Sequence, residues 1–230
     1  MMSSFEGKLR VLLAFLVLDI FAFILLFISF VTPYWIISWP RVYSGFRKMG
    51  LWEVCFAGML LEYDPAQKAY YGCWWILAPE LYEIRSFIMP PWFIVIQILV
   101  TICLMLEIIL VILDAALWVA SLQRDNSGIG RKRAPYSMVQ SVTWITVATC
   151  VMKVSSVLIF GLAYKFDPFW LPQHEINYPH FSYGLLIVSA FFSIFSSVAH
   201  RVHRSIVKTD DYINPATGAR GYFVAGTQKV

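Results

Sequence analysis

Three ionisable side chains interrupt the most apolar stretches of the chain. Asp19, Glu107 and Lys153 each lie near the middle of a long apolar run. Ionisable groups inside a membrane are costly, so they usually face other helices and pair, or they mark an ion or proton pathway. We expect a buried contact between Lys153 and Glu107, shared with Asp19. A proton or ion relay is the alternative, although no further chain of polar residues continues one.

Two cysteines form a second candidate site. Cys55 and Cys73 lie in a polar, aromatic-rich loop between two apolar runs. A lasting disulfide between them requires that the loop face an oxidising compartment. Closing a loop of this length is worth about 3 kcal/mol in the chain-entropy treatment. Two free thiols are the alternative.

Other reactive side chains do not assemble into a recognisable catalytic or metal motif. His200 and His203 are three residues apart and alternate with Arg201 and Arg204. This pattern indicates lipid-facing groups that extend toward the inner membrane surface, and two histidines alone are an incomplete metal-ligand set. The sequence contains no Cys-x-x-Cys, phosphate-binding loop or nucleophile elbow. We therefore expect no enzymatic activity, no cofactor and no resident metal.

Four apolar runs must position these groups. The chain has 230 residues, of which 59% are hydrophobic and only 14% charged, too few charges to cover a soluble domain. Three runs are long enough to cross about 30 Å of hydrocarbon as helices, and the fourth is near the lower limit. The sequence predicts one membrane domain over residues 1–230. Its expected parts are spans at 11–31, 92–120, 139–163 and 183–199, outer loops at 32–91 and 164–182, and a tail at 200–230.

Lysine and arginine predict the orientation. The N-terminal segment, the loop after the second span and the tail together carry 11 basic and 4 acidic residues. The two remaining loops carry 6 basic and 7 acidic residues. The positive-inside rule places both termini and the middle loop in the cytoplasm. The formal net charge of +4 thus reflects a basic inner face that can attract anionic lipid, and it is no sign of nucleic-acid binding.

The first outer loop has the composition of a small folded unit. It is about 60 residues long and rich in tyrosine and tryptophan, which is unlike a disordered linker. Residues 51–56 and 70–76 favour strands, so we expect a small antiparallel sheet stapled by Cys55 and Cys73. In the second loop, Phe169 and Trp170 are candidate contact residues for a partner. Insertion into the interfacial aromatic belt is the alternative for both.

The last span carries Ser189, Ser193 and Ser197 at four-residue spacing. Small residues on one helix face let membrane helices approach closely. We interpret these serines as a packing face.

The first loop resembles that of a known family. Trp35, the run Gly50-Leu51-Trp52-Glu53-Val54-Cys55, and Cys73 lie between the first two of four spans, as in the claudin and peripheral-myelin-protein superfamily. The resemblance implies a left-handed all-α transmembrane four-helix bundle with a small extracellular antiparallel β-sheet. It also implies that Trp35, Gly50, Leu51 and Trp52 anchor the sheet, and that Cys55 and Cys73 form the family disulfide. The cysteines are further apart than in typical vertebrate claudins, which is more similar to invertebrate claudin-like proteins, including those of septate junctions.

The resemblance implies a structural function in epithelium. We expect a multi-pass protein of the lateral plasma membrane that contributes to cell–cell contact and to the paracellular barrier, at septate-type junctions. The expected partners are the protein itself or other claudin-like proteins in the same and opposing membranes, other junction components and membrane lipid. A weak PDZ contact through Val230 is a further expectation, since Gln228 stands where serine or threonine is usual. A paracellular pore and an accessory subunit of a channel or receptor are the alternatives.

Charge in the first loop bears on the choice between barrier and pore. The loop carries five basic and five acidic residues, whereas a charge-selective pore needs an unbalanced ring of side chains. This balance favours a barrier.

Overall fold

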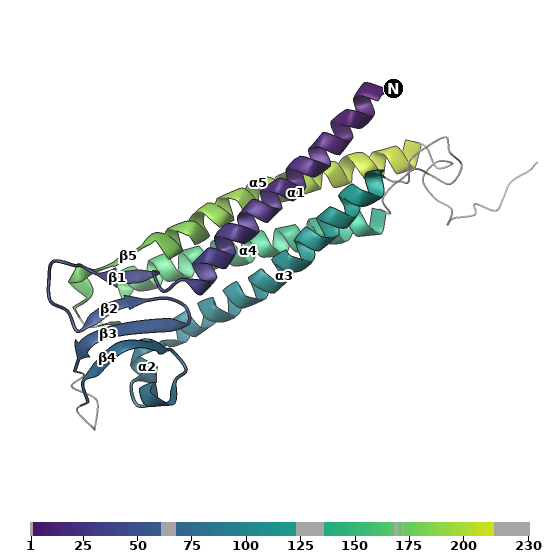
Figure 1. Cartoon of the computed structure of the whole chain (residues 1–230). Helices are drawn as coiled ribbons and strands as arrows, with labels where there is room; N and C mark the ends of the chain where they lie inside the picture. Colours follow the sequence, from purple (N-terminus) through teal and green to yellow (C-terminus); the bar gives the residue numbers. More distant parts are fainter. Residues whose placement is uncertain (1, 61–67, 123–135, 168–169, 172, 214–230) are drawn as a thin grey trace, which may run out of the picture.

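Four long helices dominate the structure, a computed structural model that describes residues 2–60, 68–122, 136–167, 170–171 and 173–213 (Figure 1). Successive helices are antiparallel, and each packs on two neighbours in the order α1–α3–α4–α5 around the bundle. All four are long and apolar enough to cross a membrane. Their bounds are α1 Met2–Val31, α3 Pro91–Leu122, α4 Tyr136–Phe166 and α5 Phe181–Ile213.

The helices are longer than the apolar runs that predict them. The largest difference is at α5, which continues to Ile213, whereas its apolar run ends near residue 199. Hydropathy detects only the part of a helix that suits hydrocarbon, and polar residues such as Arg201 and Arg204 can extend the same helix into the headgroup region. Pro91 opens α3 at a position where its missing N–H costs nothing, because the first helical N–H groups have no partner within the helix.

A five-stranded antiparallel sheet covers one end of the bundle, the end opposite the N-terminus of α1 (Figure 1). We call this the sheet end and the opposite one the far end. The strand order is β4-β3-β2-β1-β5. A 3₁₀ turn at Pro79–Leu81 and a short helix α2 at Arg85–Ile88 lead from the sheet into α3. The strands are β1 Ile36–Ser38, β2 Phe46–Met49, β3 Glu53–Met59, β4 Tyr70–Trp75 and β5 Asn177–Pro179.

The fifth strand joins the two loops into one sheet. Asn177–Pro179 follows α4 in the chain but pairs with β1, with Ile37 opposite Tyr178. The sequence predicts strands at 51–56 and 70–76, and the first of these begins later, at Glu53. Residues 50–52 form a turn instead, closed by the Gly50 N–H donating to the Glu53 carbonyl at 2.8 Å.

The larger of two apolar clusters among the described residues runs from the sheet into the bundle. It includes the fully buried side chains of Trp35, Phe46, Phe93 and Phe160. Large apolar side chains also cover the outside of the helices, for example Ile112 at 62% and Phe191 at 55% exposed. An apolar surface of this kind suits helices that are surrounded by lipid.

Candidate functional site

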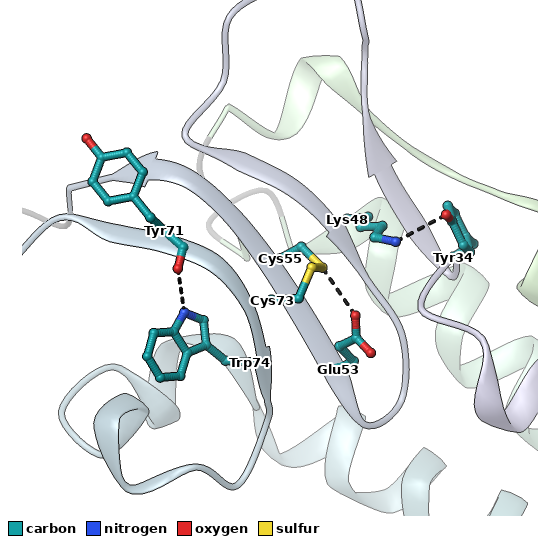
Figure 2. Close-up of a disulfide and its surroundings, with 7 residues drawn as sticks. All are labelled: Tyr34, Lys48, Glu53, Cys55, Tyr71, Cys73 and Trp74. Atoms are coloured by element: carbon teal, nitrogen blue, oxygen red, sulfur yellow. Dashed lines mark hydrogen bonds between the residues drawn. A yellow bond between two sulfur atoms is a disulfide. The ribbon is translucent and has the colours of Figure 1, made fainter.

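A disulfide joins the last two strands of the first loop. Cys55 on β3 lies directly opposite Cys73 on β4, and their sulfur atoms are bonded (Figure 2). Glu53 Oε1 lies 3.4 Å from Cys55 Sγ; this is a contact and not a hydrogen bond, because a disulfide sulfur carries no proton to donate. The bond therefore fixes the β3–β4 hairpin covalently, on the sheet that carries the exposed aromatic residues described below.

Trp35 connects the sheet to two helices. Its side chain is 1% exposed, and its indole N–H donates to the Ser29 carbonyl of α1 at 2.9 Å. The indole meets the Phe160 ring of α4 edge-on, with ring centroids 5.0 Å apart. A buried tryptophan with its N–H satisfied contributes both apolar area and orientation. These contacts link the start of the sheet to the bundle.

The Gly50-Leu51-Trp52 turn lies directly on the helices. A Cβ atom at Gly50 would stand 2.5 Å from Pro33 Cα, so no larger residue fits without movement. The Leu51 carbonyl accepts a hydrogen bond from Gln97 Nε2 of α3 at 2.6 Å. Trp52 packs on Phe30 of α1, with ring centroids 5.4 Å apart. The turn therefore makes close contacts with α1, with the segment that follows α1, and with α3.

Several aromatic side chains of the sheet and its connections project from the molecule. Tyr71 and Trp75 lie on β4, an edge strand, and Figure 2 shows Tyr71 beside Trp74, whose indole N–H donates to the Tyr71 carbonyl. We call five of these residues the exposed aromatic set; they are Trp39 at 49%, Tyr43 at 79%, Tyr71 at 67%, Trp75 at 59% and Tyr82 at 70% exposed. Unburied aromatic groups on a rigid scaffold are typical of contact surfaces.

Trp170 corrects one expectation from the sequence. It is 3% exposed, so it is neither a surface contact residue nor part of an interfacial belt. Its indole N–H donates to the Ile88 carbonyl at 3.1 Å, and its ring packs edge-on against Trp92 with centroids 4.5 Å apart. The aromatic cluster around Trp92 and Phe160 offers it more buried area than the surface does. Phe169 lies outside the described residues.

Inside the bundle, Lys153 of α4 contacts Glu107 of α3. Lys153 is 1% exposed, and its ammonium also donates to Ser189 Oγ at 2.7 Å and to Ser193 Oγ at 2.8 Å. The serine face of α5 therefore does more than allow close packing, because it supplies hydrogen-bond acceptors for a buried cation. The four-residue spacing of the serines marks the face but not this partner.

Asp19 does not join that pair, as we expected it to, but lies against a histidine. His200 Nε2 is 3.1 Å from Asp19 Oδ2 and 3.8 Å from Asp114 Oδ2. The expectation that His200 faces lipid is wrong, since its side chain is 2% exposed. Because α5 continues beyond residue 199, His200 falls seven residues after Ser193 and so on the same buried face. That spacing is the signal in the sequence that could have identified it.

Among the residues that the structure describes, two groups of side chains have ligand atoms close enough to hold a metal ion. Glu53, Cys55 and Cys73 form the first, but the disulfide leaves its sulfurs without the thiolate charge that binds metal. Asp19, Asp114 and His200 form the second, and all three are buried.

Comparison with known proteins identifies the family. A family model described as PMP-22/EMP/MP20/Claudin tight junction matches residues 20–201. No curated protein matches the chain. The matched segment runs from the middle of α1 into α5, and it includes the whole sheet and the disulfide. The chain therefore belongs to the PMP-22/EMP/MP20/claudin family.

Proposed function

We propose that this protein is a structural component of cell junctions that contributes to cell–cell contact and to the paracellular barrier of an epithelium. Membership of the claudin family supports a structural, non-enzymatic role at junctions in general. The observation that carries the proposal is the stapled sheet, which holds the exposed aromatic set at one end of a membrane bundle. No catalytic step enters the proposal.

The exposed aromatic set supports contact with other protein molecules. Tyrosine and tryptophan bring large apolar area at a small cost in side-chain entropy, and they are enriched among the residues that dominate binding energy. β4 is also an edge strand of the sheet, and another strand can add to such an edge. We propose copies of this protein or other claudin-like proteins as partners, both within one membrane and across the gap, together with other junction components.

The contacts of two cations support a barrier over a charge-selective pore. Two first-loop cations make internal contacts: Lys48 donates to Tyr34 Oη at 3.1 Å, and Arg85 donates to the Leu77 and Ala78 carbonyls. Charges held in this way are less available to form a selective ring in the gap between cells. Septate-type junctions are our finer proposal, based on the long separation of Cys55 and Cys73.

The proposed location is the lateral plasma membrane, with the sheet outside and both termini in the cytoplasm. The basic residues of the far end, such as Arg201 and Arg204, support this orientation. The disulfide supports it independently, because such bonds persist in oxidising compartments. Val230, the proposed PDZ-binding residue, lies outside the described residues.

Membrane lipid is a further proposed partner at the far end. A groove of about 470 Å³ between α4 and α5 is lined by Tyr136, Trp144, Arg201, Arg204 and Lys208, among others. Its cations suit the phosphate of an anionic lipid, while Trp144, 57% exposed, offers an apolar flank to an acyl chain.

Depletion and rescue in an epithelium test the proposal. We expect the protein to stain the lateral membrane, and a fluorescent dextran applied to one side to leak across after depletion. Wild-type protein should restore the barrier, whereas a Tyr71→Ser/Trp75→Ser variant should reach the membrane but restore it poorly. Val202→Ser is the control, because it removes a comparably exposed apolar side chain at the far end, outside the lipid groove. Diffuse staining with an intact barrier would contradict the proposal, and co-purification of a channel would then favour an accessory subunit.

A further inference from the structure

Two layers of ionisable side chains lie inside the bundle. The layer nearer the sheet contains Glu107 and Lys153, and the other contains Asp19, Asp114 and His200. Glu107 and Asp114 are seven residues apart on α3, and Ser193 and His200 have the same spacing on α5. At 1.5 Å per residue, the layers are about 10 Å apart along the helices.

The two layers differ in charge. In the first, one ammonium faces one carboxylate, so the charges balance. The ammonium also donates to two serine hydroxyls, while Glu107 Oε2 finds no hydrogen-bond partner among the described residues. In the second, two carboxylates face one imidazole, and all three side chains are at most 4% exposed. With both carboxyl groups ionised and the histidine neutral, this layer carries two negative charges, which are costly in the interior of a membrane protein.

One carboxylate oxygen in the second layer has no donor. Asp114 Oδ2 is fully buried and finds no hydrogen-bond partner among the described residues. It is directed toward His200 Nε2, but 3.8 Å is beyond hydrogen-bonding distance. A buried oxygen without a donor calls for a further partner, which a bound ion can supply.

The distances within the second layer match those between ligands on a metal ion. Zinc binds imidazole nitrogen at about 2.0–2.1 Å and carboxylate oxygen at about 2.0–2.2 Å in tetrahedral geometry, which separates two ligand atoms by about 3.4 Å. His200 Nε2 lies 3.1 Å from Asp19 Oδ2 and 3.8 Å from Asp114 Oδ2, on either side of that value. One ligand atom from each residue lies within 4.8 Å of the other two.

We propose that Asp19, Asp114 and His200 bind one divalent transition-metal ion, for which Zn²⁺ is the best fit. Two carboxylates and a neutral imidazole give a ligand set of charge −2, which a divalent ion neutralises. Three protein ligands leave the fourth tetrahedral position for a water molecule. The Phe15 ring, 4.9 Å from the His200 ring, packs against the site from α1. The ion links α1, α3 and α5 inside the membrane.

The test uses the full chain, purified in detergent through a tag that contains no histidine and treated with a chelator. After incubation with Zn²⁺ and desalting, we expect one zinc per chain by elemental analysis and a raised melting temperature, since a ligand that binds only the folded state stabilises it. Co²⁺ in place of Zn²⁺ should give the visible absorption bands of a tetrahedral site. Asp114→Asn and His200→Gln should each lower bound zinc at least tenfold. His203→Gln, which alters the nearby histidine outside the proposed ligand set, is the matched control and should bind like wild type.

Asp114→Asn is nearly isosteric, so it carries the test if His200→Gln does not fold; an intact Cys55–Cys73 disulfide and a monodisperse elution peak identify folded protein. Less than about one tenth of a zinc per wild-type chain overturns the proposal and means that a proton neutralises the layer. Equal zinc in wild type and Asp114→Asn also overturns it, because the metal then lies elsewhere.

Discussion

Lys153 and Glu107 are stable in the bundle only as a pair. Removing one partner of a buried ion pair leaves an uncompensated charge and costs about 3–5 kcal/mol, whereas replacing both by apolar residues is often neutral. We predict that Lys153→Met destabilises the protein by about that amount, and that adding Glu107→Met recovers most of the loss. Detergent-solubilised protein unfolded with increasing sodium dodecyl sulfate gives the two free energies.

The control for this pair is Lys165→Met, which removes an exposed lysine from the sheet end of the same helix. It should change the unfolding free energy by less than about 0.5 kcal/mol, as is usual for surface substitutions. A double variant as unstable as Lys153→Met alone would show that the lysine matters through its serine contacts and not through Glu107.

A single methyl group added at Gly50 tests how closely the Gly50-Leu51-Trp52 turn packs. A Cβ there would stand 2.5 Å from Pro33 Cα and 2.7 Å from the Thr32 carbonyl oxygen, and backbone atoms cannot give way as a side-chain end can. We predict that Gly50→Ala costs about 1–3 kcal/mol, the usual range for overpacking, and lowers the fraction of protein at the cell surface. Gly184→Ala is the control, because nothing lies within 4 Å of its added methyl group and alanine favours a helix. Equal surface fractions for both variants would contradict the prediction.

At the scale of elements, the disulfide stabilises the β3–β4 hairpin by lowering the conformational entropy of the unfolded chain. The bond spans a sequence separation of 18 residues, which is worth about 3 kcal/mol in the chain-entropy treatment. We predict that Cys55→Ser lowers the melting temperature and that the Cys55→Ser/Cys73→Ser double variant is no worse, since the bond is already lost.

Cys150→Ser is the control, as it changes a free cysteine within α4. A double variant markedly less stable than Cys55→Ser would indicate that the thiol of Cys73 has a structural role of its own. Reduction of the wild-type protein before heating should reproduce the loss seen in the variants.

A structural element can be predicted from the sequence when neighbouring residues determine it, and less well when residues far along the chain do. The four spans and the β3 and β4 strands follow from local composition. The expected contact of Lys153 with Glu107 follows from the position of both residues near the middle of their spans. The pairing of β5 with β1 could not be predicted, because it joins two three-residue strands about 140 positions apart. The burial of Trp170 and His200 was not predicted for a related reason. Trp170 lies in a loop and His200 lies beside arginines after the last apolar run, and both positions suggest exposure. Residues on other helices bury the two side chains.

At the scale of the whole molecule, the orientation of the protein in the membrane determines whether the sheet can meet a neighbouring cell. The basic far end favours the cytoplasm, and the same orientation brings Cys55 and Cys73 into an oxidising space and the exposed aromatic set toward a neighbouring cell. We predict that a membrane-impermeant maleimide labels Tyr82→Cys in intact cells, because this position is 70% exposed at the sheet end. Ser205→Cys, exposed at the far end, should be labelled only after permeabilisation, and wild-type protein gives the background from Cys103 and Cys150. The reverse pattern would leave the fold intact but end the junction proposal, since the sheet would then face the cytoplasm, where it meets no neighbouring cell.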